Sequence, residues 1–332
     1  MTAARYDVVA IGNAIVDVIA QATPELIAAE GLTPGAMRLI DADEAERLYA
    51  HMGPGREVSG GSAANTLAGM AALGRNCAFI GQVAEDQLGA VFKHDLTATG
   101  VTFELPPRSG GAPTARCLIL VTPDGQRTMN TFLGASHDLQ ADAIDAELIA
   151  AGEILYLEGY LWDPEATRAA MRRAIGIARE AGRKIGFTLS AVFVIDRHRA
   201  DFVKLLDDGL IDILFANEEE LLALTEASDL EAAIAATAPK VALLIVTKGP
   251  QGALAIEGGE RVEVGAEPVE RVIDTTGAGD LFAAGFLAAR AGGRDLETCL
   301  RMGAVAAAEI ISHYGARPEA DLKALVAERV RG

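Results

Sequence analysis

A glycine-rich segment near the carboxyl end of the chain combines anion-binding groups with a carboxylate. It reads Asp274-Thr-Thr-Gly-Ala-Gly-Asp280, and the apolar run after it predicts a helix. The amides of Gly277, Ala278 and Gly279 can turn toward a ligand, and a helix N-terminus favours phosphate or a developing oxyanion. Asp280, in the first helical turn, would then accept the proton of an attacking hydroxyl, as phosphoryl transfer requires. Alternatively, Asp280 only stabilises the helix dipole.

Two other glycine motifs do not fit this segment. A dinucleotide-binding fingerprint needs a third glycine at the position that Phe282 occupies. A Walker loop needs Gly-Lys followed by Ser or Thr, and that order occurs nowhere in the sequence. The segment therefore predicts neither a Rossmann nucleotide site nor a P-loop.

A second glycine pair precedes another predicted helix. In Gly60-Gly61-Ser62-Ala-Ala-Asn65 the glycines allow the backbone to approach a ligand, and Asn65 offers both a donor and an acceptor. This pattern suits the recognition of hydroxyl groups. Alternatively, Ser62 is only the N-cap that follows a flexible turn.

Polar side chains follow three of the predicted strands, where open α/β sheets bind ligands. Asn13 and Asp17 follow the first strand, and Asp17 could accept two vicinal hydroxyls or be an exposed loop residue. Asn217 and Glu220 lie one turn apart and could position Mg²⁺ through water, or belong to an acidic helix start. The third strand ends in groups that suit a nucleotide, namely Thr247, Lys248, Gly249 and Gly252.

Composition limits the classes of partner. The 332 residues are 50% hydrophobic, and the formal net charge is -18. Such a charge argues against a nucleic-acid partner or an anionic membrane, so a small-molecule ligand is expected. An anionic ligand would need local positive groups, for which Lys248, Arg116 and Arg127 are candidates. No signal peptide or membrane span is predicted, and three scattered cysteines predict reduced thiols in a cytoplasmic protein.

The order of predicted elements indicates an α/β fold. Short β-rich runs alternate with alanine-rich helical stretches, and this alternation predicts a mostly parallel central sheet between helices. Because the sequence contains no domain linker, we expect one domain over residues 1–332. The predicted strands are 8–11, 78–80, 154–157, 185–189, 211–215 and 241–246, and the predicted helices are 62–73, 164–181 and 296–311. Residues 13–40 and 101–132 lack long helical patterns and predict a small β insertion. A strand, a turn and a strand over residues 116–132 predict a hairpin that could cover a site at the strand ends, as a lid.

Taken in order, these motifs resemble the ribokinase-like (PfkB) family of carbohydrate and nucleoside kinases over nearly the whole chain. The resemblance implies a three-layer ribokinase-like sandwich with a small β lid, ATP and Mg²⁺ as cofactors, and Asp280 as catalytic base. It also implies an anion hole from Gly277 to Gly279, and a magnesium and phosphate motif at Asn217 and Glu220. Asp274, with residues 312–317, resembles the region that binds a monovalent cation such as K⁺ in many members.

Three stretches resemble adenosine kinases within that family: residues 12–17, 127–129 and 156–160. The resemblance implies that Asp17 holds ribose hydroxyls, that Arg127 approaches the transferred phosphate, and that Tyr160 packs on the base. Met129 and Phe132 could complete an apolar slot. Glu158 stands where the subgroup tends to have a small residue, so guanosine or inosine stays open as a substrate.

The expected activity is therefore transfer of the γ-phosphate of ATP to the 5′-hydroxyl of a purine nucleoside. Two alternatives stay open. One is a sugar kinase of the same family acting on ribose, fructose or a sugar phosphate, which Arg116 would favour. The other is a non-catalytic ligand sensor on a kinase fold. A monomer and a homodimer are both compatible with the sequence.

Overall fold

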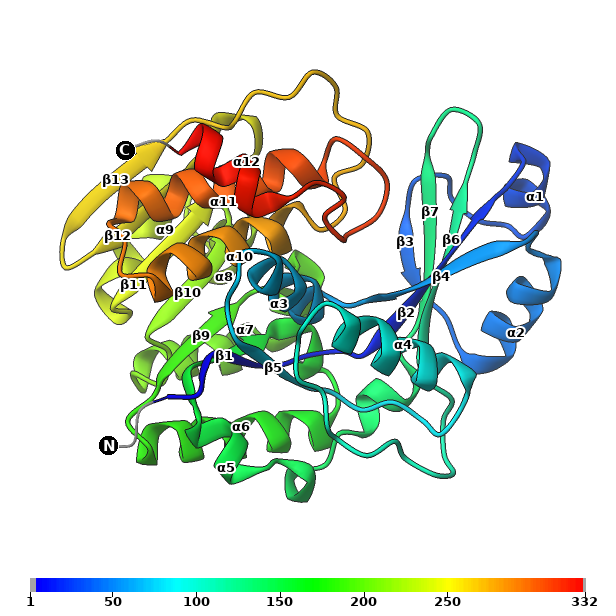
Figure 1. Cartoon of the computed structure of the whole chain (residues 1–332), viewed down its shortest axis with the longest axis horizontal. Coiled ribbons are helices and arrows are strands. Elements are labelled where there is room, and N and C mark those ends of the chain that lie inside the picture. Colours follow the sequence, from blue (N-terminus) through cyan, green and yellow to red (C-terminus); the bar gives the residue numbers. More distant parts are fainter. Residues whose placement is uncertain (1–3, 331–332) are drawn as a thin grey trace.

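The computed structural model describes residues 4–330 and contains two sheets, a large one and a small one beside it (Figure 1). The large sheet has eight strands, of which the last two along the chain form an antiparallel edge and the others are parallel. From that edge onward the strands are β13 (Glu260–Val264), β12 (Ala253–Glu257), β11 (Leu243–Thr247), β10 (Ile213–Asn217), β9 (Lys184–Thr188), β8 (Gly152–Glu158), β1 (Tyr6–Ile11) and β5 (Cys77–Ile80).

Helices cover both faces of the large sheet because alternate strand residues point to opposite faces. Val8 and Ala10 belong to one core, whereas Val9 and Ile11 belong to the other. The first core is closed by α3 (Ser62–Ala72), α10 (Ala278–Ala291), α11 (Leu296–Ile310) and α12 (Leu322–Arg329). The second is closed by α5 (Ala146–Ala150), α6 (Glu165–Glu180), α7 (Val192–Asp207), α8 (Glu218–Thr225) and α9 (Leu230–Thr237). This arrangement confirms the predicted three-layer fold with its mostly parallel sheet.

The small sheet has strand order β3 (Met37–Leu39), β7 (Arg127–Phe132), β6 (Ala115–Val121), β2 (Ile15–Gln21) and β4 (Gly55–Gly60). The predicted ranges 13–40 and 101–132 contain four of these strands, and the hairpin is formed by β6 and β7. Strand β4 lies outside both ranges, because its mixture of glycine and charged residues carries no apolar alternation. Residues 101–114 contribute only isolated bridges of Thr102 and Arg108 to the region of β5.

The remaining helices pack around the small sheet or form short turns. The α-helices are α1 (Pro24–Ala29), α2 (Ala42–His51) and α4 (Gln87–Ala98), and the 3-10 turns are η1 (Gly134–Asp138), η2 (Ala141–Ala143), η3 (Gly159–Trp162), η4 (Ala238–Lys240) and η5 (Gly249–Gln251). Within residues 4–330, no helix is long and apolar enough to cross a membrane. The three cysteines are free and buried.

A buried carboxylate connects the two parts of the molecule. Glu158, at the end of β8, accepts hydrogen bonds from the backbone and side-chain nitrogens of Asn13 at 2.7 Å each, and from the Ala63 amide at 2.8 Å. Asn13 begins the connection from β1 to the small sheet, and Ala63 lies in the first turn of α3. Burial raises the pKa of Glu158 to about 7. This carboxylate therefore holds the connection between the sheets against the start of α3.

Helices α3 and α10 approach closely because α3 has a glycine, with no side chain, at their point of contact. A Cβ on Gly69 would lie 2.6 Å from the Leu281 side chain and 2.7 Å from that of Ala284. Leu281 and Ala284 are fully buried. The missing side chain at Gly69 thus sets the spacing of the two helices whose first turns carry Ser62 and Asp280.

We expect Gly69→Ala to lower the free energy of unfolding by about 1–3 kcal/mol, because the added methyl overpacks the contact between the helices. The matched control is Gly176→Ala in α6, where a Cβ meets no atom within 4 Å. It should gain about 0.5–1 kcal/mol from helix propensity. Urea unfolding of both variants measures the difference, and equal stabilisation by both substitutions would contradict this packing.

Glu158→Gln tests the buried carboxylate through its dependence on pH. The folded chain binds the Glu158 proton more tightly than the unfolded chain, so ionisation of the wild type costs stability as pH rises from 5 toward about 7. The amide variant should be less stable at pH 5, because its NH₂ group faces N–H donors. Across this interval the deficit should shrink by about 2 kcal/mol. Urea unfolding at several pH values checks this; a constant difference would refute it.

Candidate active site

Asp280 lies in the first turn of α10 and is held by two side chains from α3. Its Oδ1 accepts a hydrogen bond from Ser62 Oγ at 2.6 Å, and its Oδ2 accepts one from Asn65 Nδ2 at 3.1 Å. Thr66 Oγ1 also donates to the backbone oxygen of Asp280 at 3.2 Å. The loop before it turns at Gly277, whose φ of 78° is in the left-handed region that glycine adopts without strain. Asp280 is therefore fixed in orientation.

Two carboxylates face the same cavity, and burial acts on both. Burial raises the pKa of Asp280, while its hydrogen bonds from Ser62 and Asn65 oppose that rise. Burial raises the pKa of Asp17 to about 6, with Arg127 and Arg317 acting in the opposite direction. Carboxyls with raised pKa values are suited to accept a proton near neutral pH.

The cavity between the large and small sheets measures about 440 Å³. Its floor is built by Ser62, Asn65, Asp280 and the loop before Asp280, and its roof includes Ile15, Cys117, Ile119 and Met129 of the small sheet. We call it the acceptor cavity. It continues into a mostly apolar slot of about 160 Å³, lined by Asn13, Ile15, Met37, Leu39, Ser62, Met129, Thr131, Leu133, Glu158, Tyr160, Asp163 and Phe193.

A second cavity of about 520 Å³ lies on the other side of the same glycine-rich loop. We call it the donor cavity. Its lining is mainly apolar and includes Pro250, Val269, Val272, Ala308 and Ile311. Both cavities are lined by Thr247, Thr275, Ala278, Gly279 and Phe282, whereas Asp280 lines only the acceptor cavity. The amide-rich turn is thus shared by two sites large enough for small molecules.

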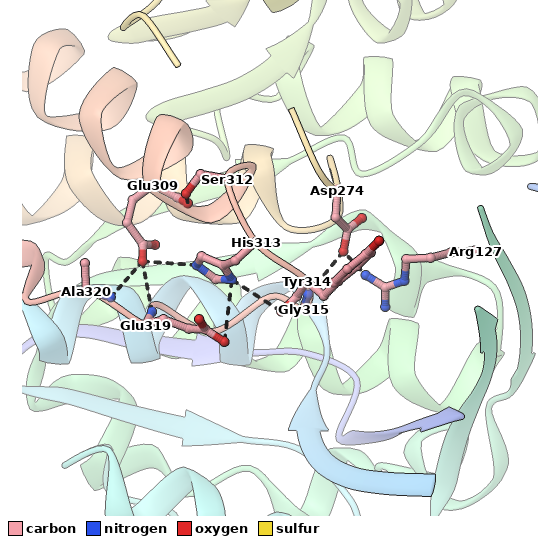
Figure 2. Close-up of polar contacts among 9 residues, drawn as sticks. All are labelled: Arg127, Asp274, Glu309, Ser312, His313, Tyr314, Gly315, Glu319 and Ala320. Carbon is pink, nitrogen blue, oxygen red and sulfur yellow. Dashed lines mark hydrogen bonds and ion pairs between the residues drawn. The ribbon is translucent and has the colours of Figure 1, made fainter. Parts of the chain in front are cut away.

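Arg127, from β7 of the small sheet, reaches the Asp274 carboxylate at the start of the glycine-rich loop (Figure 2). Asp274 Oδ2 also accepts a hydrogen bond from the Gly315 amide at 3.1 Å, and its Oδ1 accepts one from the Thr276 amide at 3.0 Å. Among the described residues, Arg127 Nε and Nη2 are buried with no hydrogen-bond partner. These two donors could bind an anion. The predicted monovalent cation site at Asp274 stays a prediction.

Asn217 and Glu220 form a capping box at the start of α8. Asn217 Oδ1 accepts from the Glu220 amide at 2.7 Å, and the Glu220 carboxylate accepts from Asn217 N and Nδ2 at 3.0 Å each. Burial raises the pKa of Glu220 to about 7. Both residues line the acceptor cavity, so a free lone pair of Glu220 fits a water-bridged Mg²⁺. Residues 4–330 contain no cluster of three metal-binding side chains, so phosphate oxygens and water would complete such a site.

Most of the predicted site residues meet at these cavities. The acceptor cavity is lined by Asp17, Gly61, Asn65, Met129, Tyr160, Asn217, Glu220, Thr247, Gly277, Ala278, Gly279 and Asp280, and the slot adds Asn13. Gly249 and Gly252 line the donor cavity. Gly60 lies beside Asp17, because a Cβ there would be 2.6 Å from Asp17 Oδ2.

The three cations proposed from sequence are placed differently. Lys248 lines neither cavity, and its Nζ contacts Glu263 at 2.8 Å. Arg116 lies over the Tyr49 ring, with 5.9 Å from its Cζ to the ring centroid. Only Arg127 reaches the glycine-rich loop. Phe132 is buried but does not line the slot.

Sequence reasoning missed two residues near the site. Phe193, the second residue of α7, lines the slot, and its ring lies 6.1 Å from that of Tyr160. Arg317 donates to Ser59 and Ala64, on either side of the glycine pair. Phe193 belongs to no motif. Arg317 ends the stretch 312–317, which suggests only a cation site. Both residues reach the site through contacts between distant segments, which no local signal records.

Comparisons with known proteins agree on the family. Residues 25–322 match the model of the pfkB family carbohydrate kinases. The adenosine kinase structure from Sinorhizobium meliloti is 47% identical, with 98% of this chain and 99% of that chain covered and a TM-score of 0.91. A probable sugar kinase structure from Rhizobium etli CFN 42 is 44% identical, with 98% of each chain covered and a TM-score of 0.91.

A curated relative carries a sugar kinase name. A fructokinase of Salmonella typhimurium is 31% identical over 236 residues, which cover 70% of this chain and 76% of that protein. The family implies a phosphotransferase that uses ATP, typically with Mg²⁺, and an alcohol group of a nucleoside or sugar as acceptor. The chain belongs to the pfkB family of carbohydrate kinases, and its fold is ribokinase-like.

Proposed function

We propose that this protein transfers the γ-phosphate of ATP to the 5′-hydroxyl of a purine nucleoside. The observation that carries the proposal is the glycine-rich loop shared by two cavities, of which only one contains Asp280. A phosphate that lies on the loop amides can be reached from the donor side by a nucleotide and from the acceptor side by a hydroxyl. In-line transfer requires this arrangement.

The acceptor cavity and its slot have polar and apolar parts that match the ribose and the base of a nucleoside. Asp17 can accept the two ribose hydroxyls, because its carboxylate faces the cavity and accepts no hydrogen bond from another described side chain. The slot beyond offers Tyr160 and Phe193 with Met129 for the faces of a base. Polar groups at Asn13, Glu158 and Asp163 can read the base edge. A purine nucleoside would fill both the polar and the apolar part.

The donor cavity suits ATP. Its apolar wall, formed by Val269, Val272 and Ala308, can take the adenine ring, and Gly249 and Gly252 allow close approach of the backbone. The phosphates would then extend toward the Gly277 to Gly279 amides. Lys248 lines neither cavity and contacts Glu263, so we assign the phosphates no contact with it.

Asp280 accepts the proton of the 5′-hydroxyl in this mechanism, while Ser62 and Asn65 fix the direction of its lone pairs. The amides of Gly277, Ala278 and Gly279 stabilise charge on the transferred phosphoryl group. Two buried guanidinium nitrogens of Arg127 have no partner among the described residues, but Arg127 lines neither cavity, so its contact with the same group would require the lid to move. Glu220 would hold Mg²⁺ through water, and the ion supplies positive charge to the phosphates when bound. The small sheet excludes water as a lid.

A sugar kinase is the second candidate, and the named relatives keep it open. Among the described residues, no Lys or Arg lines the acceptor cavity or its slot, which argues against a phosphorylated sugar. Arg116, which would favour that alternative, contacts Tyr49 instead. An unphosphorylated sugar would leave the apolar slot empty. A nucleoside therefore matches the cavity better.

The substrate proposal is tested by coupled ADP release with Mg·ATP against adenosine, guanosine, inosine, ribose, fructose and fructose 6-phosphate. We expect selective turnover of a purine nucleoside. Tyr160→Ala should raise KM for that nucleoside about 10-fold or more, because base stacking on an aromatic ring contributes about 1–3 kcal/mol. Turnover of a sugar alone, unaffected by Tyr160→Ala, would contradict the nucleoside assignment.

Asp280→Asn should lower kcat by about 10² to 10⁴-fold, because a positioned general base typically contributes that much. The KM for the nucleoside should change little, since Asn keeps the size of the side chain. Coupled turnover of the variant and wild type checks this, with circular dichroism to establish equal folding. Wild-type kcat in the variant would remove Asp280 from the mechanism. The raised pKa of Asp280 also predicts that wild-type kcat/KM falls as pH decreases.

A further inference from the structure

The loop between α11 and α12 (residues 311–321) is fastened to the body of the protein at three points. Glu309 Oε1 accepts hydrogen bonds from the Glu319 and Ala320 amides at 2.9 and 2.8 Å and from His313 at 3.0 Å (Figure 2). The Gly315 amide donates to Asp274, as described above. The third point is Arg317, whose role in the site no motif assigns.

Arg317 donates hydrogen bonds to both ends of the segment 59–64, which contains the glycine pair. Its Nε donates to Ser59 O at 3.1 Å, its Nη2 to Ser59 Oγ at 3.1 Å, and its Nη1 to Ala64 O at 2.7 Å. Ser59 is in β4 of the small sheet, whereas Ala64 is in α3 under the large sheet. Between them lie Gly61, with φ of 96°, and Ser62, which holds Asp280. One guanidinium therefore fixes the crossing between the two sheets.

The charge of Arg317 interacts with carboxylates that form no hydrogen bond or ion pair with it. Asp17 of β2, Asp95 of α4 and Asp280 of α10 all act on it electrostatically. No ion pair to Arg317 occurs within 4 Å in the part of the chain that the structure describes, and its nitrogens donate to neutral oxygens. Burial lowers the pKa of Arg317 to about 10, so it stays protonated at neutral pH.

Few other charged groups act on Asp17, Asp95 and Asp280. Arg127 acts on Asp17, and Asp280 in turn acts on Glu158 and Asp17. Asp95 Oδ2 accepts a hydrogen bond from the Ser59 amide at 3.2 Å. Arg317 is the cation that acts on both Asp17 and Asp280, and it lowers the pKa of each.

We propose that Arg317 is a positioning residue for phosphoryl transfer, which clamps residues 59–64 against the loop between α11 and α12 and whose charge keeps Asp280 and Asp17 ionised. The proposal rests on the proposed function, because it gives Asp280 the role of base. Arg317 lines neither cavity, so we expect it to make no direct contact with the substrate. It acts through the orientation of Ser62 and through the field at the two carboxylates.

The test uses the full chain with Arg317→Lys, Arg317→Met and the control Arg179→Met. Arg179 also joins two segments, through an ion pair with Asp212 at 3.1 Å and a hydrogen bond to Gly209 O at 2.7 Å. These contacts lie at the amino-terminal end of β10, whereas the acceptor cavity lies at its carboxyl end. The measurements are kcat and KM for the nucleoside between pH 5 and 9, and amide hydrogen exchange over residues 59–64.

Arg317→Lys should lower kcat, because lysine lacks the planar set of N–H donors that contacts Ser59 and Ala64 together. It should leave the acid limb of the kcat/KM profile at its wild-type pH, because it keeps the positive charge. Arg317→Met should lower kcat and also move the acid limb to higher pH by about one unit, because loss of a nearby positive charge raises a carboxyl pKa. Both should speed exchange over residues 59–64, unlike Arg179→Met. If Arg317→Met does not fold, Arg317→Gln replaces it.

Wild-type kcat and an unshifted acid limb in the neutral variant would overturn the proposal. An equal loss of activity in the Lys and Met variants, with no shift of the limb, would also overturn it, because that is the result of a merely structural role. A wild-type enzyme without turnover on any substrate would instead count against the proposed function. In that case hydrogen exchange alone decides whether Arg317 clamps the segment.

Discussion

The proposed mechanism depends on one carboxylate, Asp280, that stays charged and oriented at the meeting point of two helices. Asp280 is partly removed from water, which disfavours its ionised form, and the protein offsets that cost with donors from Ser62 and Asn65. Those donors reach it only if α3 and α10 lie close together, as the bare Cα of Gly69 permits. The turn at Gly61 and the clamp by Arg317 then follow from the need to start α3 at this point.

An acidic protein that binds a nucleoside triphosphate needs its positive groups close to the bound phosphates. The formal charge of -18 repels anions at long range, so attraction has to come from groups next to the ligand. The glycine-rich loop supplies amides at the start of α10, and Arg127 supplies a guanidinium with two buried nitrogens that have no partner in residues 4–330. The pairing of Arg127 with Asp274 brings a cation from the small sheet to that loop and thus couples the roof of the acceptor cavity to its floor.

Much of the fold was predictable, because its signals are local. Periodicity placed strands near β1, β5, β8, β9, β10 and β11, and helices near α3, α6 and α11, within a few residues of their observed ends. Strand β4 was missed because its sequence is polar and its pairing with β2 depends on the rest of the small sheet.

The site was predictable where motifs carry it and not where contacts between distant segments do. Gly61, Asn217, Glu220 and the loop before Asp280 line the acceptor cavity, and the roles predicted for them stay predictions. Lys248 was chosen by charge, but the neighbouring strand offers Glu263 as its partner. Arg317 meets Ser59 across most of the chain length, so its role depends on tertiary structure that no pattern records.

The central claim is direct transfer of a phosphoryl group between the two cavities to a nucleoside 5′-oxygen. The most direct test is phosphorus NMR of the product formed from ATP that carries ¹⁸O on every γ-phosphate oxygen, in ordinary water. The account predicts a nucleoside 5′-monophosphate with label on all non-bridging oxygens and an unlabelled bridging oxygen from the nucleoside. Phosphate that has acquired solvent oxygen, or phosphate on any acceptor other than a nucleoside 5′-oxygen, would contradict it.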